Sequence, residues 1–239
     1  MIDIERLNSL AGRYCGTADA RACALLAAYA EAVLEKNEVM NLTAITEPRA
    51  FEDKHLLDSL ACAASGAVRG QVCDVGTGAG FPGVALKIAK PEIDITLVDA
   101  TAKKLVFIEE CCAKLGIEGV FCVHGRAEEL GRSASFRESF DCVCGRAVAH
   151  LAALCELCLP LVCVGGNMIA MKGPDAESEV ALAARAISQL GGKVSDISRY
   201  DLPDGDRRAL IIIEKIAQTP PQYPRSGKNI IKSPIINDI

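Results

Sequence analysis

The sequence predicts an α/β fold, in which a seven-stranded, mostly parallel β-sheet with one reversed strand carries helices on both faces and follows an N-terminal helical extension. Two observations support this prediction. From residue 71 onward, short β-branched runs alternate with longer amphipathic runs, as in repeated β-α-β units. Between residues 1 and 65, apolar residues instead recur every three or four positions, which is the spacing of helices.

The N-terminal extension, residues 1–65, contains two clear helical patterns. The run "ADARACALLAAYAEAVLEKN" spaces its Leu, Ala and Val residues at three and four. The run "PRAFEDKHLLDSLACAA" begins with Pro48, which suits the first turn of a helix. The helical pattern stops near "SGAVRG", so we place a boundary there and expect a second domain over residues 66–217.

Seven strands are expected in that second domain. In chain order they are "QVCDV", "DITLVDA", "GVFCVH", "FDCVCGRA", "NMIAMKG", "GKVSDISRY" and "RALIIIEKI". The first five are separated by amphipathic runs, which predicts parallel pairing. The last two are joined by "DLPDGDR" without a helix, so we expect them to pair in antiparallel fashion.

Composition limits the classes of function. The chain has 239 residues, of which half are apolar, and a formal net charge of −5, which argues against non-specific coating of nucleic acid but leaves a local basic face open. No apolar run approaches the ~20 residues of a membrane span, and "MIDIERLNSL" does not resemble an export signal. We therefore expect a cytoplasmic protein with no membrane contact.

Twelve cysteines occur, mostly inside apolar runs. The only CxxC pair, Cys155 and Cys158, lies within the helical run "LAALCELCLPL", and no second pair stands at metal-ligating distance in the sequence. We expect these thiols to pack in the core and expect no metal site.

The last segment, residues 218–239, is a basic tail. Arg225, Lys228 and Lys232 have no balancing acid before Asp238, and the prolines and glycine rule out a long helix. On composition alone, a solvated and partly disordered end remains one interpretation of this tail.

The stretch "DVGTGAGFPG", residues 74–83, is the main candidate for a ligand site. Read from Gly78 it fits GxGxxG, the loop that places a pyrophosphate at a helix N-terminus. Read from Asp74 it is an acid followed by GxGxG, which suits S-adenosylmethionine, whose ammonium and carboxylate groups need an acid and exposed backbone. A turn without ligand is the third interpretation, and glycines alone do not choose among them.

Two later positions indicate a nucleoside. Asp99 ends the next strand, where an acid can accept both ribose hydroxyl groups. Ala127 and Glu128, after the third strand, are placed to lie along an adenine, although they also suit an ordinary helix start.

Motifs typical of several other enzyme classes are absent from the sequence, which limits the reactions to consider. No tyrosine has a lysine four residues later, as small dehydrogenases commonly do, and no cysteine follows Pro or Thr, as in methylation at pyrimidine carbon five. The fourth strand leads into Arg146 rather than the Asn/Asp-Pro-Pro motif of amine methylation. Transfer to a nucleophile that needs little activation remains, and N7 of guanine, with its free lone pair, meets that description; positioning is then most of the task.

At this point the chain resembles the RsmG (GidB) family of bacterial 16S ribosomal RNA guanine-N7 methyltransferases. The matching stretches are "NLTAI", "KHLLDSL", "DVGTGAGFPG", "VDATAKKLVFIEE", "GRAEEL", "FDCVCGRAVAHLAALCELCLPL", "GGNMIAMKG" and "YPRSGKNIIKSPI". The resemblance implies a class I, Rossmann-like methyltransferase fold. It also implies methylation of a guanine in the 530 loop of 16S rRNA, which we expect to take place in the 30S subunit without an obligate protein partner.

The resemblance also implies roles for individual residues. The expected S-adenosylmethionine site comprises Gly76, Gly78, Gly80, Phe81, Asp99, Ala127, Glu128 and Arg146. The expected catalytic residues are Arg146, Lys172 and Arg126. The expected RNA contacts are Asn41, His55, Lys103, Arg225 and Lys228.

Some roles stay open. His55 and Asp58 are three apart on one helical face, which suits either an acid/base pair or a structural contact, and guanine N7 needs no base. Asn41 is expected either to touch substrate or to cap the turn before Pro48. Two other functions also remain: an NAD-linked oxidoreductase using the same loop, and a non-catalytic nucleoside-binding factor in ribosome assembly.

Overall fold

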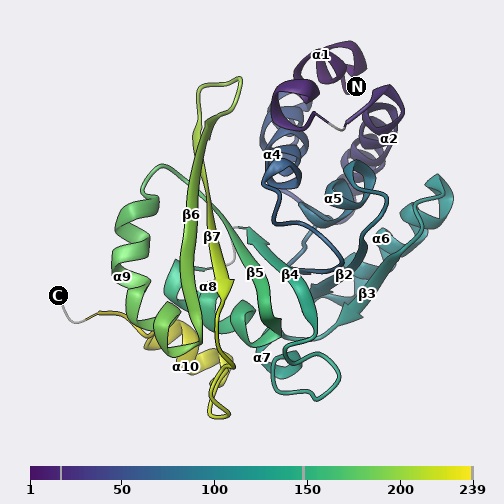
Figure 1. Ribbon diagram of the computed structural model, residues 1–239. Helices are drawn as coiled ribbons and strands as arrows, with labels where there is room; N and C mark the ends of the chain where they lie inside the picture. Colours follow the sequence, from purple (N-terminus) through teal and green to yellow (C-terminus); the bar gives the residue numbers. More distant parts are fainter. Residues whose placement is uncertain (17, 147–148, 238–239) are drawn as a thin grey trace.

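The computed structural model describes residues 1–16, 18–146 and 149–237. Within them, seven strands form one sheet in the order β3-β2-β1-β4-β5-β7-β6 (Figure 1). The strands are β1 (Gln71–Val75), β2 (Asp94–Asp99), β3 (Val120–His124), β4 (Phe140–Arg146), β5 (Val162–Lys172), β6 (Gly192–Asp201) and β7 (Arg207–Lys215). Strand β7 is antiparallel to both neighbours, and the other pairs are parallel. The predicted sheet with one reversed strand is confirmed.

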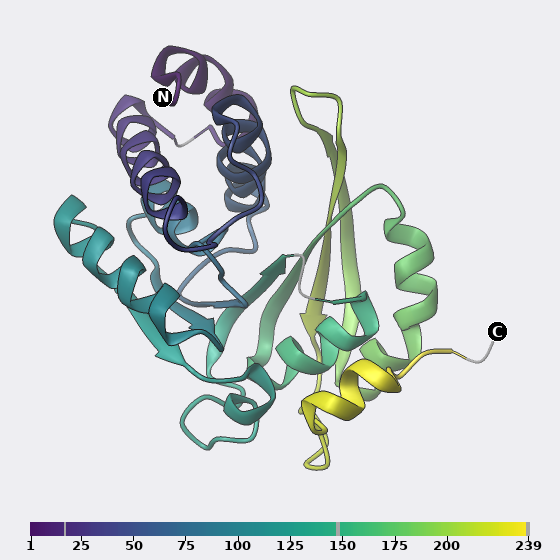
Figure 2. The same ribbon diagram turned by 180° about the vertical axis from the view of Figure 1, so that it is seen from behind.

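Helices cover both faces of this sheet. The α-helices are α1 (Ile4–Tyr14), α2 (Ala20–Asn37), α3 (Pro48–Phe51), α4 (Asp58–Ala64), α5 (Gly83–Ala89), α6 (Ala102–Leu115), α7 (Ala127–Leu130), α8 (Leu151–Cys158), α9 (Ala176–Gln189) and α10 (Gly227–Lys232). A π-helical turn (Glu52–Leu57) links α3 to α4, and a 3₁₀ turn (Leu159–Leu161) follows α8. Helix α2 contacts α5 and α6 on one face, while α8 contacts α9 and α10 on the other (Figures 1 and 2).

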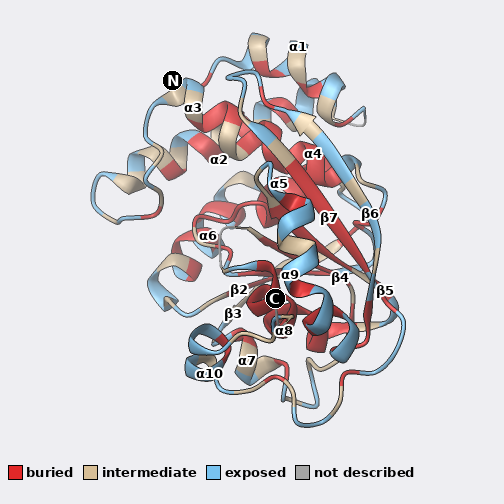
Figure 3. Cartoon of the chain, turned by 90° about the vertical axis from the view of Figure 1, so that its left-hand side faces the viewer, coloured by how far each residue is buried: buried red, intermediate tan, exposed pale blue. Residues whose placement is uncertain are grey.

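Each strand feeds two hydrophobic cores, because successive side chains point to opposite faces. In β1, Val72 packs in the core that contains Leu60 of α4, whereas Cys73 packs in the core that contains Leu154 of α8. Figure 3 shows β7 buried along most of its length and β6 more exposed at the edge of the sheet.

The N-terminal helices share the first core with the sheet. Leu7 of α1 and Leu60 of α4 are fully buried there beside Leu86 of α5. Helices end at Ala64 and the first strand begins at Gln71, but the core continues across this point. The extension is therefore held to the sheet by direct packing, which positions its loops at one edge of the site.

The helix that follows Pro48 contains a local irregularity. Glu47, rather than Asn41, caps it by accepting hydrogen bonds from the N–H groups of Arg49 and Ala50. The helix widens to a π turn over Glu52–Leu57 and returns to α-helix at Asp58. Such turns are frequent at functional sites, and this one carries residues of the site described below.

The basic tail is packed against the domain between residues 218 and 237. The short helix α10 contacts α8 and buries Ile230 completely. Figure 2 shows it, in yellow, lying across α8. The tail therefore contributes to the fold, and the interpretation as a solvated, disordered end does not hold for these residues; Asp238 lies outside the described part.

The twelve cysteines are free, and most are buried. Cys155 and Cys158 pack in the second core from helix α8, where burial raises the pKa of both thiols. Core packing of this pair is confirmed. Among the described residues, no cluster of His, Cys, Asp and Glu has the arrangement of a metal site, and no helix has the length and apolar character to traverse a lipid bilayer.

Candidate cofactor and substrate site

Two cavities open at the carboxyl ends of the central strands, where parallel α/β sheets bind ligands. The first cavity, of about 570 Å³, is lined by residues that follow β1, β2 and β3 and by helix α10. The second cavity, of about 510 Å³, is lined by the glycine loop, the π turn and the ends of β4 and β5. Gly76 lines both cavities, so one extended ligand can reach from the first into the second across this residue.

Asp99 is fixed at the wall of the first cavity. Its Oδ2 accepts a hydrogen bond from the N–H of Gly78 at 3.0 Å, and its Oδ1 accepts one from the N–H of Thr101 at 2.8 Å. Each carboxylate oxygen can accept a further hydrogen bond, which suits the two hydroxyl groups of a ribose. Ala127 and Glu128 line the same cavity, so the structure brings together the three residues predicted around a nucleoside.

Asp74 does not face either cavity. Its carboxylate is buried beneath the glycine loop, where Oδ2 accepts hydrogen bonds from the Thr77 hydroxyl at 2.6 Å and the Gly83 N–H at 2.9 Å. Burial raises its pKa to about 6, partly offset by these two hydrogen bonds. Asp74 thus holds the glycine loop from beneath, because the loop folds back over the strand end.

The glycines of the loop have different tasks. Gly78 has a φ of +60° and lines the second cavity, and a Cβ added there meets no protein atom closer than 4.0 Å. Gly80 has a φ of +88°, and an added Cβ would lie 2.3 Å from the hydroxyl oxygen of Tyr29. Gly80 is also predicted at the cofactor site; the loop turns there toward helix α2, and Gly80 lines neither of the two cavities.

Phe81 lines the second cavity while remaining almost fully buried. Its ring stacks on the imidazole of His55, with centroids 5.0 Å apart and planes 19° apart. Tyr29 and Phe51 pack edge-on against the same ring. This aromatic cluster fixes the glycine loop relative to the N-terminal helices and makes a rigid wall.

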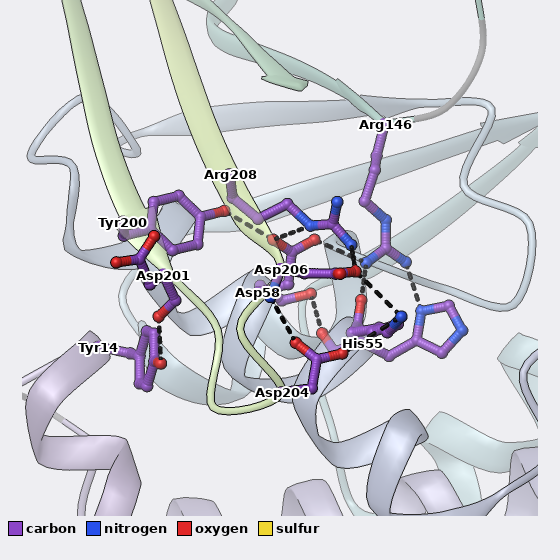
Figure 4. A network of polar contacts seen from close by, with 11 residues as sticks. Tyr14, His55, Asp58, Arg146, Tyr200, Asp201, Asp204, Asp206 and Arg208 are labelled. Atoms are coloured by element: carbon purple, nitrogen blue, oxygen red, sulfur yellow. Dashed lines mark hydrogen bonds and ion pairs between the residues drawn. The ribbon is translucent and has the colours of Figure 1, made fainter. Parts of the chain in front are cut away.

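Arg146 extends from the end of β4 to the π turn (Figure 4). Its Nη1 donates to the carbonyl oxygen of Lys54 at 2.8 Å and to Oδ2 of Asp58 at 3.2 Å. Its Nη2 lies 2.7 Å from Nδ1 of His55. The planar guanidinium is thus held by three groups of one helical segment, at the wall of the second cavity.

The contact with Arg146 determines the tautomer of His55. An arginine can only donate, so Nδ1 of His55 must accept and the ring proton sits on Nε2. Burial, together with the positive charge of Arg146, lowers the pKa of His55 to about 3. His55 is therefore a neutral, oriented ring at neutral pH.

Asp58 is held from three sides in the same network (Figure 4). The hydroxyl of Tyr200 donates to its Oδ1 at 2.6 Å, and Arg208 lies 3.8 Å from that oxygen. Its Oδ2 faces Arg146. The sequence left open whether His55 and Asp58 form an acid/base pair or a structural contact. The geometry favours the structural contact, because both side chains bind Arg146, and Asp58 also binds Tyr200.

The three residues predicted to be catalytic are not all together. Lys172 lines the second cavity with Arg146, and its Nζ donates to the Ala149 carbonyl at 2.8 Å and to Glu179 at 2.7 Å. Arg126 lies instead at the first cavity, just before α7. Arg126 is thus on the nucleoside side, apart from Arg146 and Lys172, and its catalytic role stays a prediction.

The predicted RNA contacts are also divided. His55 lines the second cavity and Lys228 lines the first. Asn41 is exposed and lines neither, although its neighbours Leu42 and Thr43 line the second. Lys103 is exposed in the first turn of α6, just after the strand that ends in Asp99.

Arg225 is engaged within the protein. Its Nη2 donates to Oε2 of Glu156 at 2.6 Å, its Nε donates to Oε1 at 2.8 Å, and its backbone N–H donates to Oε1 at 2.7 Å. Glu156 is completely buried in α8. Arg225 therefore anchors the tail, because its guanidinium neutralises a buried carboxylate, and its contact with RNA stays a prediction.

This anchor places α10 over the first cavity. Gly227, Lys228, Ile230, Ile231 and Lys232 all belong to its wall. Gly227 lies against the carboxylate of Glu128, which would have to move to admit a side chain at this position. The tail therefore forms part of the nucleoside side of the site.

Several site residues escape sequence reasoning. They are Thr43, Glu156, Tyr200 and Arg208. Thr43 and Asn41 stand in one motif, and only the backbone path decides which faces the cavity. Glu156 gave the one usable signal, as an acid inside an otherwise apolar helix that must find a partner.

Comparison with known protein families gives one match over most of the chain. Residues 22–209 match the family model described as rRNA small subunit methyltransferase G. The protein named ribosomal RNA small subunit methyltransferase G from Alkaliphilus oremlandii is 48% identical over 210 residues, covering 87% of this chain and 88% of that protein. The protein of the same name from Pelotomaculum thermopropionicum is 46% identical over 200 residues, covering 82% and 84%.

Solved structures share the fold at low sequence identity. TrmN from Thermus thermophilus has a TM-score of 0.52 at 18% identity, covering 66% of this chain and 49% of that one. The 16S rRNA (adenine(1408)-N(1))-methyltransferase from Catenulisporales acidiphilia has a TM-score of 0.51 at 16% identity, covering 66% and 90%. These similarities support the class I methyltransferase fold and nothing more specific.

Proposed function

The chain belongs to the rRNA small subunit methyltransferase G family, and on this premise we propose that it methylates N7 of a guanine in the 530 loop of 16S rRNA. It is an S-adenosylmethionine-dependent methyltransferase, which sets aside the NAD-linked oxidoreductase. When bound, the cofactor supplies a methyl group on a cationic sulfur atom.

The residues present fit this cofactor. Asp99 offers a fixed carboxylate to ribose hydroxyl groups, with Ala127 and Glu128 in the same cavity. Gly78 presents bare backbone to the adjoining cavity, where a Cβ would occupy ligand space. The adenosine part of the cofactor would occupy the first cavity, and its methionine part would pass Gly76 into the second.

The proposal rests mainly on how the candidate general bases at the second cavity are bonded. His55 and Asp58 are its described residues that have the chemistry of a general base, and both are held by protein donors. The one acceptor nitrogen of His55 is occupied by Arg146, and the buried carboxylate of Asp58 faces Arg146 and Tyr200, so neither side chain is turned toward an incoming nucleophile as a base. Guanine N7 suits such a site, because its lone pair is available without loss of a proton and catalysis reduces to alignment.

The charges around the second cavity support an RNA substrate. Lys54, Arg146, Lys172 and Arg208 all line it, although the chain as a whole carries a net charge of −5. Each of these four side chains also pairs with a carboxylate of the protein (Asp58, Asp206 or Glu179), so the cavity has no large excess of positive charge. Such a site favours a structured partner that presents one loop over long free RNA. We therefore infer that the substrate is the 30S subunit and that the protein works in the cytoplasm.

The test is mass-spectrometric mapping of 7-methylguanosine in 16S rRNA from cells with and without this protein. Loss of a single methyl group in the 530 loop, restored by the wild type but not by Arg146→Ala, is expected. Arg199→Ala, at an exposed ion pair with Glu177 on the sheet edge, is the matched control and should restore the methyl group. An unchanged methylation map would support the non-catalytic assembly factor instead.

A further inference from the structure

Thr43 lies on the loop between α2 and α3 and lines the second cavity. The loop is fixed there, because the side chain of Asn37 accepts hydrogen bonds from the N–H groups of Leu42 at 2.7 Å and Thr43 at 3.0 Å. The hydroxyl group therefore has a defined position, although the sequence singled out Asn41 rather than Thr43 within the motif "NLTAI".

The tautomer of His55 determines whether the hydroxyl group of Thr43 donates or accepts in the hydrogen bond between them. Because Arg146 donates to Nδ1 of His55, the ring proton is on Nε2. That nitrogen lies 2.9 Å from Oγ1 of Thr43, so Thr43 must be the acceptor in this bond. A charged donor on β4 thus sets the role of a hydroxyl group on a distant loop.

A second donor completes the acceptor capacity of Thr43. The N–H of Ile45 donates to the same Oγ1 at 3.1 Å. A hydroxyl oxygen has two lone pairs and one hydrogen, so both lone pairs are used and only the hydrogen remains. In the part of the chain that the structure describes, no acceptor lies within hydrogen-bonding distance of it, and Thr43 lines the cavity.

We propose that Thr43 is a specificity-determining residue that donates its hydroxyl hydrogen to O6 of the target guanine. The inference rests on the proposed function. Guanine carries acceptors at both N7 and O6 on this edge, whereas adenine carries an amino donor in place of O6. A wall group that can only donate accepts guanine and opposes adenine.

A hydroxyl group is also chemically suited to this place. A bidentate arginine on the O6 and N7 edge would cover N7, the atom that must receive the methyl group. A single neutral donor on O6 leaves N7 free. To accept a hydrogen bond from adenine instead, Thr43 would have to give up its bond to His55 or to Ile45.

The test is a cycle of two changes, one in the enzyme and one in the RNA. The value of kcat/KM is measured for wild type and Thr43→Val on 30S subunits reconstituted with either guanine or 2-aminopurine at the target position. 2-Aminopurine keeps N7 and lacks O6. Its intrinsic reactivity differs from that of guanine equally for both enzymes, so that difference cancels in the cycle.

In the wild type, loss of O6 is expected to lower kcat/KM about 10- to 100-fold more than in Thr43→Val, the range of one good base contact. Thr43→Ser retains the hydroxyl group and should stay within about threefold of wild type on guanine. Equal effects of the base change in wild type and Thr43→Val would overturn the proposal, since Thr43 would then act only through His55 and Arg146.

The hydroxyl group of Thr43 could instead donate its hydrogen to the carboxylate of the cofactor. Calorimetry of S-adenosylmethionine binding distinguishes this acceptor from O6 of guanine. Thr43→Val should bind the cofactor within about twofold of wild type, and a large loss of affinity would also overturn the proposal. If wild-type protein methylates no guanine N7 in the normal 30S subunit, the proposed function itself fails. The two failures are therefore distinguishable.

Discussion

At the scale of single residues, Arg146 organises the substrate side of the site. It binds a backbone carbonyl, a carboxylate and an imidazole that all belong to the segment from Lys54 to Asp58. The carbonyl group belongs to Lys54 and the imidazole to His55, and both residues lie in the π turn. A lysine could not make these three contacts in one plane, so the side chain is determined by geometry as well as charge.

His55 makes stability depend on pH. Its pKa is about 3 in the folded protein against 6.5 ordinarily, so its contribution is fully present above pH 6.5 and declines as the pH falls toward 3. Each pKa unit corresponds to about 1.4 kcal/mol, so the free energy of unfolding should lose about 3 kcal/mol from this group between pH 7.5 and pH 4.5. Denaturant unfolding of wild type and His55→Gln at both pH values measures it.

The wild type should show the steeper decline in this comparison. Asp74, whose pKa is raised to about 6, titrates in the same range in both proteins and cancels in the difference. Parallel declines for the two proteins would mean that His55 is not held neutral in the folded state.

At the scale of elements, the glycine loop is shaped by packing as much as by ligand. Gly80→Ala places a methyl group against the Tyr29 hydroxyl and Val84 at a positive φ, so it should lower the free energy of unfolding by about 2 kcal/mol or more. Gly12→Ala is the matched control within helix α1, where no atom lies within 4 Å, and it should raise stability by about 0.5–1 kcal/mol. Thermal unfolding distinguishes these opposite signs; a neutral Gly80→Ala would show that the loop relaxes.

The tail depends on one buried ion pair. Glu156→Gln replaces an acceptor oxygen with an amide that opposes the Arg225 guanidinium, and α10 should leave the first cavity in part of the population. If one molecule in ten keeps α10 in place, the Kd for S-adenosylmethionine rises about tenfold. Calorimetry measures the change.

The control for this element is Glu177→Gln, which removes an exposed ion pair with Arg199 on the sheet edge. It should leave cofactor affinity unchanged, because exposed pairs contribute little. An unaltered Kd in Glu156→Gln would mean that the other contacts of the tail retain α10, namely the packing of Ile230 and the hydrogen bonds from Arg132 and Arg137 to tail carbonyl oxygens.

At the scale of the whole molecule, an acidic chain binds RNA through local charge. Lys103 and Lys114 are both exposed on helix α6, eleven residues and about 16 Å apart along its axis. Lys103 is next to the strand ends that form the site, and Lys114 is at the opposite end of the helix.

These two lysines test the orientation of the RNA. Lys103→Gln should lower the slope of log affinity for 30S subunits against log salt by about 0.7–0.9, the value of one phosphate contact, while Lys114→Gln should leave it unchanged. Filter binding over a series of salt concentrations measures both. Equal slopes for Lys103→Gln and wild type would place the RNA away from the start of α6.

Local patterns predicted much of the fold. The seven strands, the reversed β7 and the helical extension follow from periodicity and from the short link "DLPDGDR", because such patterns report on neighbours in the chain. The sequence did not predict the π turn, because its residues have the same spacing of apolar positions as an ordinary helix.

The sequence by itself determined the sheet, the glycine loop and the acid Asp99 beside it, since each is specified within one β-α unit. Only the tertiary structure decided that Arg225 anchors the tail, that Asp74 holds the loop and that Thr43 faces the cavity. Asp58 and Tyr200, for example, are 142 positions apart and meet through one hydrogen bond. Contacts of this kind depend on how packed elements place side chains in space, which no local spacing encodes.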